Sequence, residues 1–133
     1  MSEGDVEIVR QAFANRALQE TAKTYWHPEI EYVEDPRFPG AASYAGREAV
    51  VRCWLDYLEA MGDDKTTTVT VEDVFDAGER QVALVRFQGR ATGSGIPFDH
   101  LWGYVVQVMD GQLAYIRAYH EPAEALEAAG ISE

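Results

Sequence analysis

The sequence predicts an α+β domain in which a curved antiparallel sheet carries helices packed on one face. Apolar residues recur at helical spacing in the first half of the chain and again near its end. The second half holds strand-like segments that alternate in polarity and are separated by glycine-containing turns. With 133 residues, 47% of them hydrophobic, the chain is expected to form a single domain, residues 1–133, with a substantial core.

Four segments have helical character. In the first, Val6, Val9 and Phe13 share one face, and Pro28 ends the second. The third follows Gly46 and carries a broad apolar face, and the last ends at Gly130, a common helix stop. The expected helices cover residues 5–18, 20–26, 47–60 and 122–128.

Five segments read as strands. Pro36 ends the first of them, and residues 36–45 are expected to form a loop. The later strands follow one another through short turns, of which Asp110-Gly111 is the strongest hairpin signal. Strands so connected form an antiparallel meander. The expected strands cover residues 30–35, 66–76, 81–91, 98–109 and 113–120.

The net charge of −12, from 23 acidic and 11 basic residues, opposes binding to nucleic acid or anionic membranes. It is compatible with a neutral or cationic small ligand. No apolar run approaches the roughly 18 residues of a membrane span. The acidic N-terminus is unlike a signal peptide, and the single cysteine, Cys53, fits a reducing compartment. We therefore expect a cytoplasmic protein without a nucleic-acid or membrane partner.

Two aspartates lie inside otherwise apolar, strand-like runs. Asp35 follows Tyr32-Val33-Glu34, and Asp99 stands between Phe98 and His100. A carboxylate in apolar surroundings is costly to desolvate unless it is paired, hydrogen-bonded or protonated. Carboxyl groups in such places often serve in acid–base chemistry, so the pattern predicts a pocket that contains both. The alternatives are a loop residue before proline for Asp35 and a strand-entry residue bonded to backbone amides for Asp99.

Both faces of the 98–109 strand are largely apolar, so both are expected to be covered. Helices account for one face. A second subunit is the natural cover for the other, which predicts a homodimer through the outer sheet face; a monomer with a few exposed aromatic residues is the alternative.

Several short motifs, in this order, carry a family resemblance. They are Val6-Glu7-Ile8-Val9-Arg10, His27-Pro28-Glu29-Ile30, Tyr44-Ala45-Gly46-Arg47-Glu48-Ala49-Val50, Asp110-Gly111-Gln112-Leu113 and the segment from Glu124 to Gly130. The chain resembles the nuclear transport factor 2-like superfamily, in its SnoaL-like and ketosteroid isomerase-like branch. The resemblance implies a cone-shaped sheet, a cystatin-like roll, with three N-terminal helices on its concave face.

The resemblance also implies roles for particular residues. Val33-Glu34-Asp35-Pro36 is similar to the segment that carries the isomerase general base, which corresponds to Asp35. Pro97-Phe98-Asp99-His100 is similar to the segment with the protonated aspartic acid that stabilises the enolate, which corresponds to Asp99. His120 lies on a strand face that the resemblance places inside the cone, where it could be a donor or base. The alternative is a histidine that is simply hydrogen-bonded at a strand end.

The isomerase also uses a first-helix tyrosine, and this chain has Ala12 or Phe13 at that place. Tyr25, Tyr32 or Tyr57 could supply a hydroxyl instead.

The pocket wall is expected to come from the inward faces of the third helix and of three strands. For these residues, ordinary core packing is the alternative. Arg86 and Arg117 fall on the opposite faces, which argues against epoxide hydrolysis of the kind found in a sister branch. The expected ligand-lining residues are Cys53, Trp54, Tyr57, Ala83, Val85, Phe87, Leu101, Gly103 and Ala118.

No cofactor or metal is expected, because the chain has neither paired cysteines, nor closely spaced histidines, nor a phosphate-binding loop. The resemblance implies a cofactor-independent enzyme that acts on a small, mostly apolar carbonyl compound by proton transfer through an enolate, as an isomerase or polyketide cyclase does. The alternative is a non-catalytic small-ligand-binding or dimerisation module of the same fold.

Overall fold

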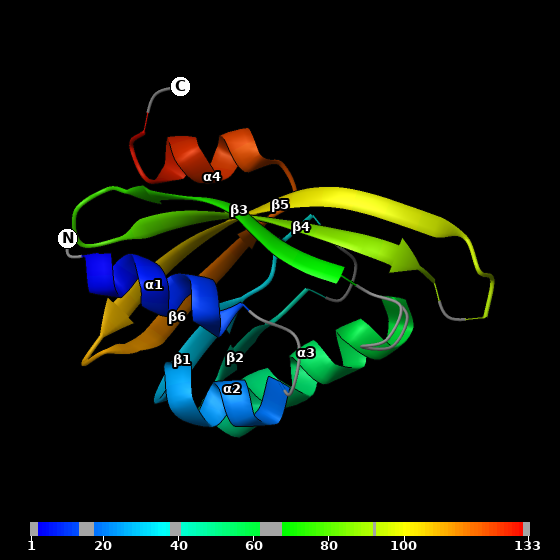
Figure 1. Ribbon diagram of the computed structural model, residues 1–133, viewed down its shortest axis with the longest axis horizontal. Helices are drawn as coiled ribbons and strands as arrows, with labels where there is room; N and C mark the ends of the chain where they lie inside the picture. The colour runs from blue at the N-terminus through cyan, green and yellow to red at the C-terminus, as the bar shows by residue number, and fades with distance from the viewer. Residues whose placement is uncertain (1–2, 14–17, 38–40, 62–67, 92, 132–133) are drawn as a thin grey trace.

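Six strands form one strongly curved, mixed sheet with the strand order β2-β1-β6-β5-β4-β3 (Figure 1). The computed structural model describes residues 3–13, 18–37, 41–61, 68–91 and 93–131. The strands are β1 (Trp26–Val33), β2 (Ser43–Ala45), β3 (Thr68–Asp76), β4 (Gln81–Arg90), β5 (Pro97–Met109) and β6 (Gln112–Tyr119). The helices are α1 (Glu3–Ala12), α2 (Leu18–Tyr25), α3 (Arg47–Met61) and α4 (Pro122–Ala128).

The predicted meander is confirmed, because β3, β4, β5 and β6 pair successively in antiparallel fashion. The β5–β6 hairpin turns at Asp110 and Gly111, which both have positive φ, as a two-residue hairpin turn with its strand twist requires. The sheet is nevertheless mixed, since β1 pairs in parallel with β6 and antiparallel with β2. Alternation along a strand shows its faces but not its neighbours, so this pairing was not predicted.

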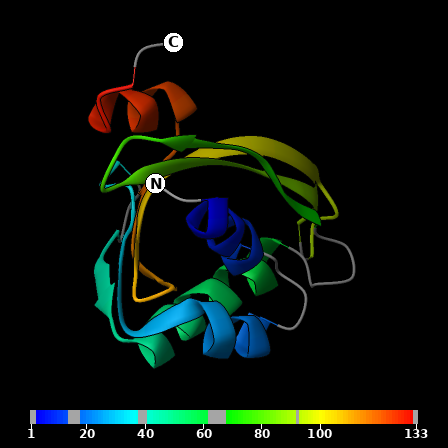
Figure 2. The same ribbon diagram turned by 60° about the vertical axis from the view of Figure 1, so that its left-hand side comes forward.

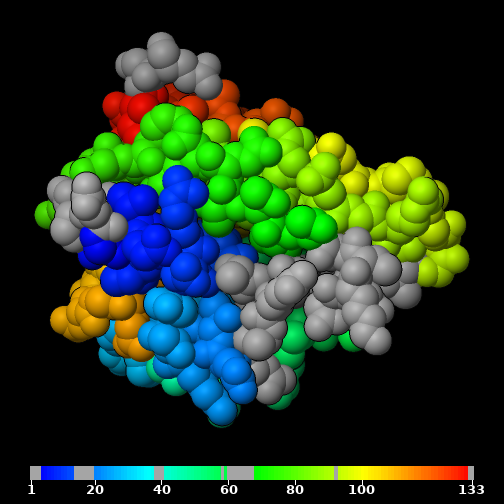
Figure 3. Space-filling view, viewed as in Figure 1, coloured from blue at the N-terminus to red at the C-terminus, as the bar shows by residue number. Residues whose placement is uncertain are grey.

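The three N-terminal helices lie on the concave face of the sheet, as predicted, and enclose the main core (Figure 2). In the space-filling view, α1 lies between the β3 edge and α2 (Figure 3). The indole N–H of Trp26 donates to the carbonyl of Ala12 at 2.9 Å and so joins the start of β1 to the end of α1. Among the largest fully buried side chains are Trp26, Tyr104, Phe87, Ile30, Leu113 and Ile116.

The fourth helix, α4, lies alone on the outer face of the sheet (Figure 1). Ala125 and Leu126 pack with Val82 and Val105 in a second, smaller core. Gly103 makes this close approach possible, because a Cβ at this position would lie 2.6 Å from the Cβ of Ala125. Part of the outer face that we assigned to a second subunit is therefore covered by the chain's own last helix.

Element boundaries differ from the predictions mainly near the N-terminus. Helix α1 ends at Ala12, and residues 14–17 of the expected 5–18 helix lie outside the described residues. Residues 66–67 of the expected 66–76 strand also lie outside them. Strand β1 already begins at Trp26, so Pro28 lies inside it, where the pairing with β6 is irregular. The short strand β2 replaces part of the expected 36–45 loop. Within the described residues, no helix is both long and apolar enough to cross a membrane.

Candidate functional site

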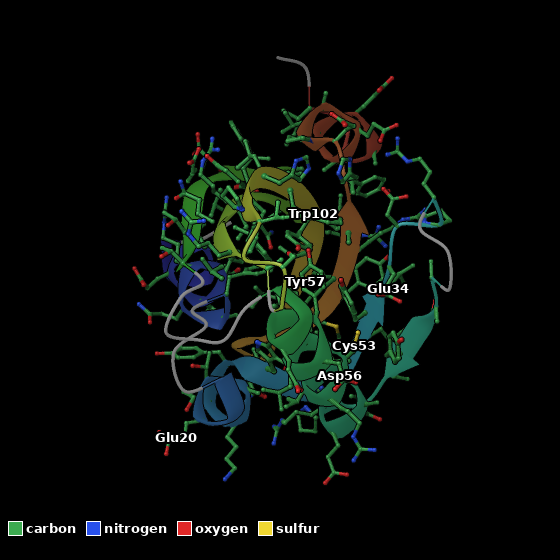
Figure 4. The ribbon with its side chains drawn as sticks, turned by 90° about the vertical axis from the view of Figure 1, so that its right-hand side faces the viewer. Glu20, Glu34, Cys53, Asp56, Tyr57 and Trp102 are labelled. Carbon is green, nitrogen blue, oxygen red and sulfur yellow. The ribbon has the colours of Figure 1, made fainter. Side chains whose placement is uncertain are left out.

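A cavity of about 270 Å³ lies between α3 and the concave face of the sheet. In Figure 4, Glu34, Cys53, Tyr57 and Trp102 lie near one another in the middle and to the right of the view, whereas Glu20 lies at the lower left, on α2. The volume is close to the lower limit for small-molecule sites. The cavity is lined by Tyr32, Glu34, Asp35, Cys53, Trp54, Tyr57, Trp102, Tyr104 and Ala118.

Five aromatic side chains form most of the cavity wall. The Tyr57 ring is nearly perpendicular to those of Trp54 and Trp102, at 90° and 86°, with centroid distances of 6.4 Å in both pairs. Trp102 stacks on Tyr104 at 6.2 Å, and Tyr32 lies 5.7 Å from Trp54. The rings therefore pack against one another around the cavity in both stacked and nearly perpendicular arrangements.

The carboxylate of Glu34 belongs to the cavity wall, and its position is fixed by β2. The Glu34 and Ala42 backbones pair, with the Glu34 amide donating to the Ala42 carbonyl, and the Ala42 amide donates to the Glu34 carboxylate at 3.1 Å. The Tyr44 hydroxyl also hydrogen-bonds the carboxylate. Within the described chain, no arginine, lysine or histidine forms an ion pair with Glu34. Its negative charge contributes to raising the pKa values of Tyr32 and Tyr57.

Tyr57 is a hydrogen-bond donor at the cavity. Burial and, to a smaller extent, the charge of Glu34 raise its pKa to about 12, although the hydrogen bond from Trp102 opposes that shift. An indole N–H can only donate, so Trp102 occupies a lone pair of the phenol oxygen and leaves the O–H free to point elsewhere. Tyr57 therefore stays protonated at neutral pH.

Cys53 lines the cavity as a neutral thiol. Burial and the nearby Glu34 charge raise its pKa to about 11, and the Tyr44 hydroxyl hydrogen-bonds it. A thiol held protonated in this way is a poor nucleophile. The predicted place of Cys53 in the pocket wall agrees with this geometry.

Asp35 also borders the cavity, but its carboxylate is occupied. It is 3% exposed and accepts four hydrogen bonds. The amides of Arg37 and His120 donate at 3.0 and 2.9 Å, and the Arg37 side chain donates through Nε at 3.3 Å and Nη2 at 3.1 Å. Burial would raise the pKa of Asp35, but these hydrogen bonds and the guanidinium charge outweigh it and lower the pKa. The geometry favours a structural clasp between the ends of β1 and β6 over the predicted general base.

The expectation that Asp99 lies in the pocket is wrong. Asp99 is on the outer face of β5, its side chain is 53% exposed, and it pairs with Arg86 at 2.8 Å. Arg86 in turn pairs with Glu72. The inward face of β5 carries Trp102 and Tyr104, because alternation places Asp99 on the other side. Asp99 therefore does not lie in an apolar site.

Leu101 and Gly103 share this outer face with Asp99, so their predicted place in the pocket wall is also wrong. Gly103 instead contacts α4. Ala83, Val85 and Phe87 are on the concave face as predicted and are fully buried. They form the core beneath the cavity, and they are not among its lining residues. Cys53, Trp54, Tyr57 and Ala118 do line the cavity.

His120 lies beside the cavity rather than in its wall. Its ring stacks on that of His100 at 4.0 Å, and both imidazoles meet the Trp102 ring edge-on, at 5.2 and 5.7 Å. The Nε2–H of His100 donates to the His120 carbonyl at 2.8 Å. The predicted catalytic role of His120 stays a prediction.

Sequence reasoning missed Glu34, Trp102 and Tyr104 as lining residues. A signal for Glu34 was present, because alternation along β1 places it on the same face as the inward Tyr32. Of the tyrosines proposed to replace the first-helix hydroxyl, Tyr32 and Tyr57 reach the cavity and Tyr25 is not among its lining residues. Among the described residues, no three His, Cys, Asp or Glu side chains are grouped to hold a metal ion.

Comparisons with known proteins agree with this architecture. A candidate SnoaL-like polyketide cyclase from Jannaschia sp. CCS1 superposes with a TM-score of 0.76 at 18% identity, covering 100% of this chain and 98% of the other. A protein with a ketosteroid isomerase-like fold from Catenulispora acidiphila, crystallised in complex with trimethylamine, gives a TM-score of 0.68 at 17% identity, with 99% and 96% coverage. An NTF2-like protein from Burkholderia thailandensis gives 0.71 at 22% identity, with 95% and 98% coverage.

A search of curated proteins gives no match. The family model of the SnoaL-like domain matches residues 6–116, which span all six strands and the three concave-face helices apart from the ends of α1 and β6. The chain therefore belongs to the SnoaL-like domain family.

Proposed function

We propose that the cavity binds a small, mostly apolar carbonyl compound and that Glu34 transfers a proton on it through an enolate. The observation that carries this proposal is that Glu34 is a carboxylate in the cavity wall without an ion-pair partner in the described chain, next to a protonated phenol donor. The other acidic residue of the wall, Asp35, has its lone pairs occupied by four donors.

The proposed reaction begins when a Glu34 oxygen accepts the proton from the carbon next to the carbonyl. The electron pair of the broken C–H bond forms the enolate double bond, and negative charge moves to the carbonyl oxygen. The Tyr57 hydroxyl donates a hydrogen bond to that oxygen. Return of the proton from Glu34 to a different carbon gives an isomerase. Attack of the enolate carbon on a second carbonyl, whose oxygen then takes the proton back from Glu34, gives a cyclase.

Neighbouring groups would support this chemistry without taking part in it. Trp102 orients the Tyr57 hydroxyl by donating to its oxygen. Asp35 links the strand end that carries Glu34 to β6 through the His120 amide. We retain the homodimer as a proposal for the outer sheet surface that α4 leaves uncovered, where Met109 is half exposed.

The experiment that tests the proposal is deuterium exchange, which detects proton abstraction whatever the final product is. Cyclohexanone and 1-indanone in D₂O are followed by proton NMR with wild type, Glu34→Gln and Asp99→Asn. Small amines are added to the assay as competitors, because a structural neighbour was crystallised in complex with trimethylamine. We expect wild type and Asp99→Asn to catalyse exchange and Glu34→Gln to lose about 10²- to 10⁴-fold.

Exchange that survives in Glu34→Gln would overturn the assignment of the base. Ketone binding in wild type without any exchange would instead favour the non-catalytic binding module. That alternative has its own support, because the two aspartates predicted to act together do not converge on the cavity.

A further inference from the structure

The cavity combines an aromatic wall with negative charge, and the part of its wall that the structure describes contains no basic side chain. All five rings named above belong to the wall, together with the carboxylates of Glu34 and Asp35, and none of the described lining residues is Lys, Arg or His. The face of an aromatic ring is the negative end of its quadrupole, so a cation that lies against several rings is attracted to each of them.

The charge of the cavity is set by Glu34. The charge of Asp35 is offset by its ion pair with Arg37. Arg117 shares a second, outer hollow with Glu34, and its guanidinium lies over the Tyr119 ring, 5.2 Å from the centroid. The protein has a net charge of −12, and the Glu34 carboxylate has no ion-pair partner in the described chain. This carboxylate would repel an anion that enters the cavity and attract a cation.

We propose that the ligand carries a small alkylammonium group, tertiary and protonated or quaternary, which the aromatic wall holds close to Glu34. The cavity volume of about 270 Å³ suits a group of this size with a short apolar remainder. Methylated ammonium groups fit aromatic walls well because they are weakly hydrated and spread their charge over their methyl groups.

The inference rests on the proposed function only in using the same cavity, and it answers a difficulty of that function. With Asp99 outside, the described lining residues include no Lys, Arg or His, so only neutral donors such as the Tyr57 hydroxyl are present to stabilise an enolate. A substrate with its own ammonium group brings that positive charge. When the proton passes from carbon to Glu34, the negative charge moves to the enolate oxygen and remains near the same cation.

The test uses choline and its neutral isostere 3,3-dimethylbutan-1-ol, which differ in a quaternary nitrogen against a quaternary carbon. Binding to the full-length protein is followed by tryptophan fluorescence and by calorimetry. We expect choline to bind about 10- to 30-fold more tightly than the isostere. Equal affinity, or preference for the neutral alcohol, would overturn the inference.

Two pairs of variants locate the effect. Glu34→Gln and Asp99→Asn remove the same charge, and only Glu34→Gln should weaken choline binding, by about 10-fold, because Asp99 is on the outer face. Tyr57→Phe keeps the ring face and should retain the choline preference, whereas Tyr57→Leu should reduce it. Equal losses in Glu34→Gln and Asp99→Asn would attribute the affinity to net charge and contradict the site. Isostere binding and circular dichroism report whether each variant is folded.

Failure of this inference is distinguishable from failure of the proposed function. Exchange of neutral ketones without preference for choline would leave the proton-transfer proposal standing and remove the cationic ligand. Selective choline binding without exchange of any ketone would support the cationic ligand and remove the proton-transfer proposal.

Discussion

Replacing Asp35 with asparagine tests its assignment as a structural clasp. The substitution keeps the shape of the side chain but removes the charge and one acceptor. The amides of Arg37 and His120 donate to different carboxylate oxygens. Whichever way the asparagine amide turns, its NH₂ group faces one of these N–H donors. One buried backbone amide then loses its partner, and the guanidinium loses its countercharge.

The expected destabilisation follows from these contacts. An unsatisfied buried donor costs about 1–3 kcal/mol, and hydrogen bonds to a charged group are each worth about 1.5–3 kcal/mol. Because Arg37 is partly solvated and retains Glu124, we expect a loss at the lower part of the combined range, about 3 kcal/mol in the free energy of unfolding. For a chain of this length that corresponds to a fall in Tm of roughly 10 °C.

The pH dependence of the stability difference between wild type and Asp35→Asn is a second, independent test of the prediction. The folded-state pKa of Asp35 is lowered relative to the unfolded chain. Its contribution is therefore present above the unfolded value of about 4 and is lost as the pH falls through the lower, folded value. Urea unfolding, followed by tryptophan fluorescence from pH 7 to pH 3, should show the gap between wild type and Asp35→Asn narrowing below about pH 4.

Asp99→Asn is the matched control, since it removes an exposed carboxylate in an ion pair worth about 0–1 kcal/mol. A change below about 1 kcal/mol for Asp35→Asn at pH 7, or a gap that stays constant down to pH 3, would refute the clasp.

Three further predictions concern other parts of the molecule. Gly103→Ala should lower the free energy of unfolding by about 1–3 kcal/mol, because the new Cβ would lie 2.6 Å from that of Ala125. Adding Ala125→Gly should restore part of this stability in chemical denaturation. A lack of recovery would place the strain elsewhere. Cys53 should react slowly with iodoacetamide at pH 7.5, with a rate that rises toward its pKa of about 11, and rapid alkylation near neutral pH would contradict the burial described. If the outer sheet surface forms a homodimer, sedimentation should give twice the monomer mass and Met109→Lys should shift it toward monomer, whereas a monomeric wild type would remove that proposal.

The fold was predictable because its local signals agree with one another. The alternation of β4, the Asp110-Gly111 turn and the helical spacing in α3 each specify one element, and their order specifies an α+β meander. The parallel pairing of β1 with β6 was beyond such reasoning, since it joins segments about 85 residues apart and leaves no local mark.

The candidate site was only partly predictable, and β5 shows why. Both of its faces are apolar, one because it borders the cavity and one because α4 covers it, so alternation alone did not show which face was inward. Asp99 was therefore placed on the wrong side. The register with β4 would have decided the matter, because Ala83 and Val85 pair with Tyr104 and Trp102.

The choice between Glu34 and Asp35 depended on contacts that arise only on folding. Both residues stand at the end of β1, and sequence motifs favoured Asp35. The donors that occupy Asp35 include the His120 amide, 85 positions away. Glu34 is instead held in the cavity wall by hydrogen bonds from β2 and from the residue that precedes β2. This segment was expected to be a loop.

A bound ligand is expected to contact Glu34 and not Asp35. The carbon-13 chemical shifts of the side-chain carboxyl carbons report this contact during titration of labelled protein with 1-indanone and, separately, with choline. We predict that the Glu34 resonance, assigned by its absence in Glu34→Gln, moves with saturation while that of Asp35 stays nearly constant. Movement of the Asp35 resonance with Glu34 unchanged would contradict it.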